Sequence, residues 1–150
     1  MGDELVSVLA VRSSDGVEVV VSEEAAQQSA LLRVYFENAD GTPGTCLHLD
    51  NIDGRTLALV CKFMRYYAKS PYAPIHHPIQ TSDLHDLFQS DVWYARFGMS
   101  QTFEDAVNIA LAADFLGLDA LVKLEGIVVA ANLYGKDNDA IRKYIVGTNE

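Results

Sequence analysis

Two pairs of closely spaced residues have side chains that commonly bind metal ions. Cys46 and His48 stand two positions apart, so a strand would place both side chains on one face. His76 and His77 are adjacent in a proline-rich stretch, where neighbouring side chains rarely converge on one ion. Nothing near either pair completes a tetrahedral ligand set. We therefore predict no metal site.

The sequence also lacks the familiar motifs of catalysis. It contains no glycine-rich phosphate loop, no nucleophile elbow and no His-Glu-x-x-His pattern. The neighbouring acids Glu104 and Asp105 fit the start of a helix, where negative charge is favourable, better than they fit an acid/base pair. We therefore predict a binding module with no catalytic residues and no cofactor.

The chain that must carry these residues has 150 positions, a length typical of one domain or of one domain with a helical appendage. Its formal net charge of −10 disfavours binding to nucleic acid or to an anionic membrane surface. The amino terminus is acidic where a signal peptide would be basic, and two cysteines make no disulfide framework. We expect an intracellular protein, cytoplasmic or nuclear, in which Cys46 and Cys61 are ordinary core thiols.

Three segments have the composition of strands, and all lie in the first third of the chain. The first two, residues 5–11 and 17–21, flank the turn signature Ser13-Ser14-Asp15-Gly16 and predict a β-hairpin. The third is a short run at residues 46–49.

The rest of the chain has helical periodicity. Ser22 is the expected N-cap of the first helix, Gly98 is expected to end one helix, and Gly117 is expected to cap another. The segment 103–116 is almost wholly apolar, which predicts a core helix covered on most sides. The pattern predicts an α+β fold whose helices span residues 23–28, 30–37, 55–69, 83–88, 91–97, 103–116, 119–134 and 139–145.

One predicted helix, residues 55–69, carries a basic stripe opposite its apolar face. Four of the eleven basic residues of this acidic chain make up the stripe: Arg55, Lys62, Arg65 and Lys69. Such a stripe is typical of a solvated helix face, and it would equally suit an acidic partner. The sequence leaves both interpretations open.

Several local strings, in order along almost the whole chain, carry a family resemblance. They are the Ser13–Gly16 turn, Ala26-Gln27-Gln28-Ser29, Val92-Trp93 with Phe97, Ala112-Ala113-Asp114-Phe115-Leu116, Ala120-Leu121-Val122, Val129-Ala130, Gly135-Lys136 and Ile141-Arg142-Lys143. Any one of these strings is weakly specific, but their order and spacing together are fairly specific. Through them the chain resembles the Skp-type adaptors of SCF ubiquitin ligases, relatives of elongin C with the BTB/POZ fold.

The resemblance implies a BTB/POZ domain over residues 1–117, with a small three-stranded sheet, and a helical C-terminal extension over residues 118–150. It implies a non-catalytic bridge between the N-terminal region of a cullin and the F-box of a substrate receptor. The positions that match the family's cullin contact are Asp114 and Phe115. The apolar positions that match its F-box side are Val107, Leu121, Leu124, Val128, Ile141 and Ile145.

Other interpretations compete with this one. An elongin C-like adaptor would hold a different receptor box, and a self-associating BTB module would have no ligase role. A homodimer is also expected for an adaptor that lacks its partners. Leu121, Leu124 and Val128 stand at helical spacing, which is more often typical of core residues than of an interface.

The sequence departs from the family pattern at several positions. Asp114 replaces an asparagine, so a retained cullin contact calls for a cation or a hydrogen-bond donor on the partner. Tyr94 replaces an aspartate, and Asn138 replaces the proline that is hydroxylated in some members. The family continues into a further helix after the position of Glu150, so the C-terminal extension is shortened relative to it.

Overall fold

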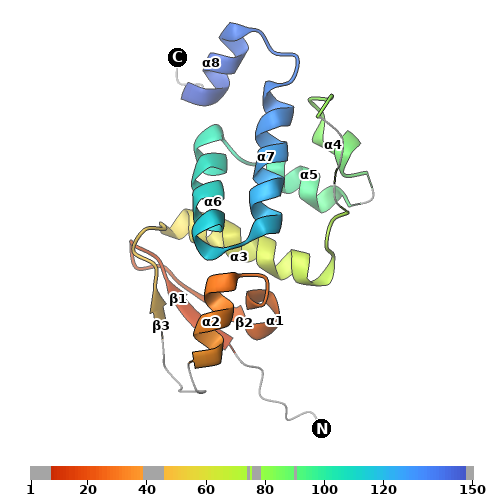
Figure 1. Cartoon of the computed structure of the whole chain (residues 1–150). Coiled ribbons are helices and arrows are strands. Elements are labelled where there is room, and N and C mark those ends of the chain that lie inside the picture. Colours follow the sequence, from red (N-terminus) through yellow and green to blue (C-terminus); the bar gives the residue numbers. More distant parts are fainter. Residues whose placement is uncertain (1–7, 39–45, 74, 76–78, 90, 148–150) are drawn as a thin grey trace. The chain divides into compact units, whose positions relative to one another are not determined.

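The computed structural model in Figure 1 describes residues 8–38, 46–73, 75, 79–89 and 91–147. The pair His76 and His77 lies outside the described residues. The chain packs into two compact units. Unit 1 comprises Met1–Pro71 and Leu111–Asp119, and unit 2 comprises Tyr72–Ala110 and Ala120–Glu150.

Unit 1 contains the three-stranded sheet, with the strand order β2-β1-β3. The hairpin is confirmed, because β1 pairs antiparallel with β2 around a turn in which Ser13 donates its backbone N–H to the Val17 carbonyl. Gly16 of that turn has a φ of 88°, a conformation that favours glycine. β3 lies parallel to β1 on its other side. The strands are β1 (Val8–Arg12), β2 (Glu18–Ser22) and β3 (Cys46–His48).

Side-chain caps begin two helices of unit 1. The Ser22 side chain accepts the backbone N–H of Ala25 at 3.2 Å, which confirms its predicted role as an N-cap. Asp53 accepts the backbone N–H of Thr56 in the same way, at 2.8 Å. Helices α1, α2 and α3 contribute to a core with the inner face of the sheet (Figure 1). They span Glu23–Ala26, Ala30–Asn38 and Gly54–Lys69.

Helix α6 (Phe103–Leu116) begins in unit 2 and ends in unit 1. At its end, Gly117 has a φ of 74°, and the next residue, Leu118, donates its N–H to the Ala113 carbonyl at 2.8 Å. This geometry confirms the predicted glycine cap. A side chain at position 117 would also meet Ala30 of α2, because a Cβ there would lie 2.8 Å from the Ala30 Cβ.

The contact between the end of α6 and the start of α2 also contains a buried hydroxyl. Ser29, which is fully buried, donates its hydroxyl to the Leu116 carbonyl at 2.6 Å and accepts the Leu32 backbone N–H at 3.1 Å. The side chain therefore caps the start of α2 and at the same time pairs with the end of α6.

Unit 2 is built around an aromatic cluster. Tyr94 is completely buried and makes edge or tilted ring contacts with Tyr72 and Phe88. Trp93 stacks on Phe97 with a centroid separation of 5.0 Å. The helices of this unit, besides the first part of α6, are α4 (Leu84–Leu87), α5 (Val92–Met99), α7 (Asp119–Leu133, whose first residue belongs to unit 1) and α8 (Asn138–Val146).

The expectation that Gly98 ends a helix is wrong. α5 continues through Gly98 to Met99, and Gly98 is buried. A Cβ at this position would lie 2.8 Å from Leu84 Cδ1 and 2.8 Å from Val128 Cγ2. The glycine therefore serves close packing of α5 inside unit 2 rather than helix termination.

The predicted α+β class with a small three-stranded sheet is confirmed. The predicted domain boundary after residue 117 stays a prediction, because a division into compact units does not test which segments fold independently. Among the described helices, none is both long enough and apolar enough to cross a membrane.

Candidate functional site

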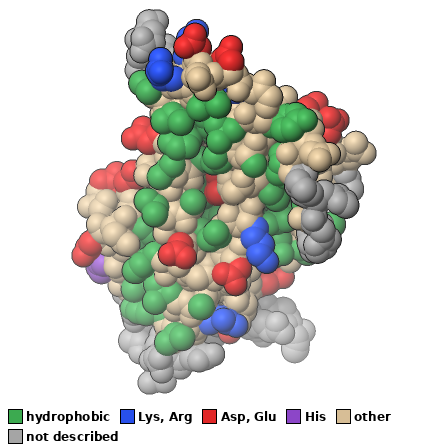
Figure 2. Space-filling model, turned by 45° about the horizontal axis from the view of Figure 1, so that its top comes forward, with side chains coloured by type: hydrophobic (Ala, Val, Ile, Leu, Met, Phe, Trp, Pro, Cys, Tyr) green, Lys and Arg blue, Asp and Glu red, His purple; other side chains and the backbone are tan. Residues whose placement is uncertain are grey.

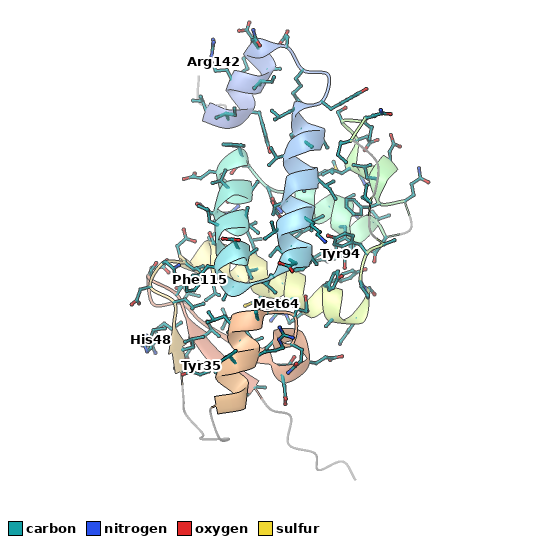
Figure 3. All side chains as sticks on the ribbon, in the orientation of Figure 1. Tyr35, His48, Met64, Tyr94, Phe115 and Arg142 are labelled. Atoms are coloured by element: carbon teal, nitrogen blue, oxygen red, sulfur yellow. The ribbon has the colours of Figure 1, made fainter. Side chains whose placement is uncertain are left out.

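The C-terminal turns of α6 expose apolar side chains in unit 1. The exposed fractions are 65% for Leu111 and 49% for Phe115, which Figure 3 labels on this helix. Residues four apart on a helix lie on the same face, so these two side chains form one apolar strip. The expectation that α6 is covered on most sides is therefore wrong for this face, although the other faces of the helix are buried.

The two residues predicted to face a cullin lie on this strip or beside it. Phe115 belongs to the strip, and the neighbouring Asp114 is also exposed. Ala112, Ala113 and Leu116 point into the core and hold the helix in place. A partner at this surface would therefore meet an apolar patch with a carboxylate at its side, which we call the α6 surface (Leu111, Asp114 and Phe115).

The residues predicted to face an F-box divide into two groups in unit 2. Leu121, Leu124 and Val128 of α7 are completely buried, so in the isolated chain they are core residues. This agrees with the core interpretation of their helical spacing. Their contact with an F-box stays a prediction, because it needs surface that the isolated chain does not offer.

The other three predicted F-box positions are accessible. Ile145 of α8 is 46% exposed, Val107 of α6 is 36% exposed, and Ile141 is half-buried. Val146, next to Ile145, is exposed as well. Figure 2 shows one face of the molecule, on which hydrophobic side chains gather among acidic ones.

α8 is the least embedded helix of unit 2. It contributes no fully buried side chain, although its N-cap Asp137 accepts the Ala140 backbone N–H at 2.9 Å. Tyr144 attaches the helix through a ring contact with Phe103, at a centroid separation of 5.3 Å. Because few apolar side chains are buried, the packing of α8 contributes little stability.

A buried acid on α7 was missed at the sequence level. Glu125 is only 1% exposed, and its Oε2 accepts the side-chain Nε2 of Gln101 at 3.0 Å. The pKa of Glu125 is raised to about 8, mainly because the carboxyl is buried and also because of the charge of Asp105, while the hydrogen bond from Gln101 acts in the opposite direction. The sequence did hold a signal, because Glu125 falls on the apolar stripe that Leu121 and Val128 define.

The cysteines differ from each other. Cys61 is buried, as predicted, and burial raises the pKa of its thiol to about 11. The expectation of a core thiol is wrong for Cys46, which is half-buried on β3 with its Sγ 3.5 Å from Glu18 Oε2. Within the part of the chain that the structure describes, no group of three or more metal-binding side chains is found. All four residues of the basic stripe are exposed on α3.

Comparison with known proteins identifies relatives over most of the chain. No family model matches the sequence. The E3 ubiquitin ligase complex SCF subunit sconC of Arthroderma otae is 27% identical over 141 residues, which cover 91% of this chain and 81% of the relative. The S-phase kinase-associated protein 1 homolog of Tetrahymena thermophila is 28% identical over 125 residues, which cover 83% and 73%. These relatives confirm the resemblance to Skp-type SCF subunits.

Proposed function

We propose that this chain, a relative of Skp-type SCF subunits, is a non-catalytic adaptor that bridges a cullin and F-box substrate receptors. The names of the relatives support a role in an SCF-type ubiquitin ligase. The observation that carries the bridging role is that both units expose apolar side chains, unit 1 at the end of α6 and unit 2 on α8. An adaptor of this kind would act in the cytoplasm or the nucleus.

The BTB/POZ fold is part of this proposal. The three-stranded sheet, its order β2-β1-β3 and the helices that follow it support a BTB/POZ domain over residues 1–117. The helices after residue 117 support a receptor-binding extension.

In this proposal the cullin binds the α6 surface. Leu111 and Phe115 supply apolar area that is desolvated on binding, and aromatic side chains are often the energetic centres of interfaces. Asp114 would lie at the edge of the contact, where its charge selects a partner with a lysine, an arginine or a hydrogen-bond donor at that point.

The F-box binds the accessible apolar positions of unit 2. Val107, Ile141 and Ile145 are the predicted F-box residues with exposed surface, and a short amphipathic helix such as α8 suits a helix-in-groove contact. Leu121, Leu124 and Val128 would support this surface from the core of the unit.

The test measures binding of the full chain to a cullin N-terminal domain and, separately, to an F-box peptide. We expect both to bind. The double variant Asp114→Ala with Phe115→Ala should weaken cullin binding by about tenfold or more, the loss typical of one interface hot spot, and leave F-box binding unchanged. Val20→Ala is the matched control, because Val20 is also an exposed apolar residue of unit 1.

Two results would contradict the proposal. The first is binding to neither partner, and a stable dimer in light scattering that ignores the F-box peptide would then favour a self-associating module. The second is an equal loss of cullin and F-box binding in the double variant, which would indicate unfolding or a wrong assignment of the α6 surface.

A further inference from the structure

Glu125 belongs to a buried polar cluster in unit 2. Its neighbours come from three other segments: Gln101 from the turn before α6, Asp105 from α6 and Tyr144 from α8. Glu125 Oε1 and Gln101 Oε1 have no hydrogen-bond partner among the described residues. A proton on the Glu125 carboxyl adds a hydrogen-bond donor to this cluster, whereas an ionised carboxylate adds only a further acceptor.

Asp105 is the other acid that faces Glu125, and its charge contributes to the raised pKa of Glu125. Its carboxylate accepts the Thr102 backbone N–H at 3.1 Å, and the Thr102 hydroxyl accepts the Asp105 backbone N–H at 3.1 Å. This reciprocal capping arrangement places the Asp105 charge at the positive end of α6. Glu125, whose pKa is raised, is the acid that holds a proton in this cluster.

The cluster is closed on one side by the weakly embedded α8. The buried hydroxyl of Tyr144 lies close enough to Glu125 for the carboxylate charge to raise the Tyr144 pKa, although burial is the larger cause. Figure 1 shows α8 beside the start of α6 and the end of α7, at the end of unit 2. Because α8 buries no side chain fully, its detachment costs less than opening any other side of the cluster.

We propose that Glu125 is a protonation switch for α8: the helix stays packed while this carboxyl is neutral and detaches when the carboxyl ionises, so that water reaches the charge. The proton leaves to solvent. An ionised Glu125 beneath a packed α8 would be an unpaired buried charge next to the charge of Asp105, which is strongly unfavourable. The switch does not rest on the adaptor role.

The experiment follows hydrogen exchange of backbone amides by NMR on the full chain, without any partner. The amide of Ile145 reports on α8, and the amide of the buried Ile109 reports on α6. One proton is released per opening, so the opening constant of α8, corrected for intrinsic exchange, should rise about tenfold per pH unit between about pH 5 and about pH 8. In Glu125→Gln it should be independent of pH. Glu104→Gln removes an exposed acid from α6 and should behave like the unchanged chain.

Three results would overturn the switch. They are an opening constant of α8 that does not change with pH, a Glu125→Gln variant that keeps the tenfold slope, and equal opening constants at Ile145 and Ile109, which would mean that the unit unfolds as a whole. If Glu125→Gln does not fold, carbon-detected titration of the Glu125 carboxyl and exchange at the Ile145 amide are followed together in the unchanged chain. A raised carboxyl midpoint with exchange at Ile145 that rises as the pH approaches it supports the switch, and a midpoint near the ordinary 4.5, or exchange at Ile145 that does not follow the carboxyl, overturns it.

Discussion

Buried polar side chains hold segments together in both units, but with different partners. In unit 1, the Ser29 hydroxyl pairs with the backbone carbonyl of Leu116 and the backbone N–H of Leu32. In unit 2, the Glu125 carboxyl pairs with a side-chain amide and leaves one oxygen without a partner among the described residues.

The two arrangements respond differently to solution conditions. A serine hydroxyl and backbone groups do not titrate, so the Ser29 junction has the same strength across the physiological pH range. A buried carboxyl exchanges a proton with solvent, so the stability of unit 2 depends on pH. Whether the buried side chain can titrate, rather than burial itself, therefore decides whether such a junction depends on pH.

Glu125→Gln would replace the titrating carboxyl of unit 2 by a group that does not titrate, as in unit 1. We expect this variant to show the largest change in stability. The folded-state pKa of about 8 lies above the ordinary 4.5, so the protonated form stabilises the fold at low pH and this stability is lost as the pH rises through about 8. The free energy of unfolding falls by on the order of 1 kcal/mol for each pH unit between about pH 5 and about pH 8. Denaturant unfolding at several pH values should show it in the unchanged chain and not in Glu125→Gln.

Two parallel stability curves would contradict this expectation, because the pH dependence would then come from another group. Glu104→Gln is again the matched control, since it removes one negative charge from an exposed position.

Ser29→Ala would remove the two pH-independent hydrogen bonds that the Ser29 hydroxyl makes in unit 1. It leaves the Leu116 carbonyl and the Leu32 N–H without their side-chain partner inside the core, which costs about 1–3 kcal/mol of unfolding free energy. The loss should be the same at every pH where the chain is folded. Ser100→Ala is the control, because Ser100 also donates to a helix carbonyl, that of Phe97, but is exposed. A loss of similar size in both variants would show that burial is not the cause.

Asp137→Ala has the smallest expected effect, because it acts only on the start of α8. Removing the side chain that accepts the Ala140 N–H costs about 1 kcal/mol of local helix stability. Hydrogen exchange of α8 should accelerate, while exchange at Ile109 stays unchanged. Asp137→Asn keeps an acceptor at the N-cap and should restore the slow exchange. Acceleration at Ile109 as well would mean that α8 and α6 open together.

Local chemistry explains why so much of the fold was predictable. The Asp-Gly turn, the Ser22 cap and the Gly117 cap each depend on residues within a few positions of each other, so the sequence alone locates them. The periodicity of the long helices is local in the same sense. Gly98 was misread because its role depends on Leu84 and Val128, which are distant in the sequence.

The candidate site was less predictable, because exposure depends on the assembled fold. The family resemblance grouped Leu121 with Ile145, yet the first is buried in the core and the second is exposed on α8. Leu111 was assigned to a covered helix and is largely exposed. The place of Glu125 on an apolar stripe is visible in the sequence, but its burial and its contact with Gln101 depend on the assembled fold.

The position of Trp93 has a practical consequence for studying this protein. It is the only tryptophan of the chain, and it lies in unit 2, stacked on Phe97 and in contact with Tyr94. Its fluorescence emission therefore reports on the environment of Trp93 within unit 2 and does not respond to local unfolding of the sheet in unit 1. Comparing the emission with the circular dichroism of all the helices would show whether both units unfold in a single transition.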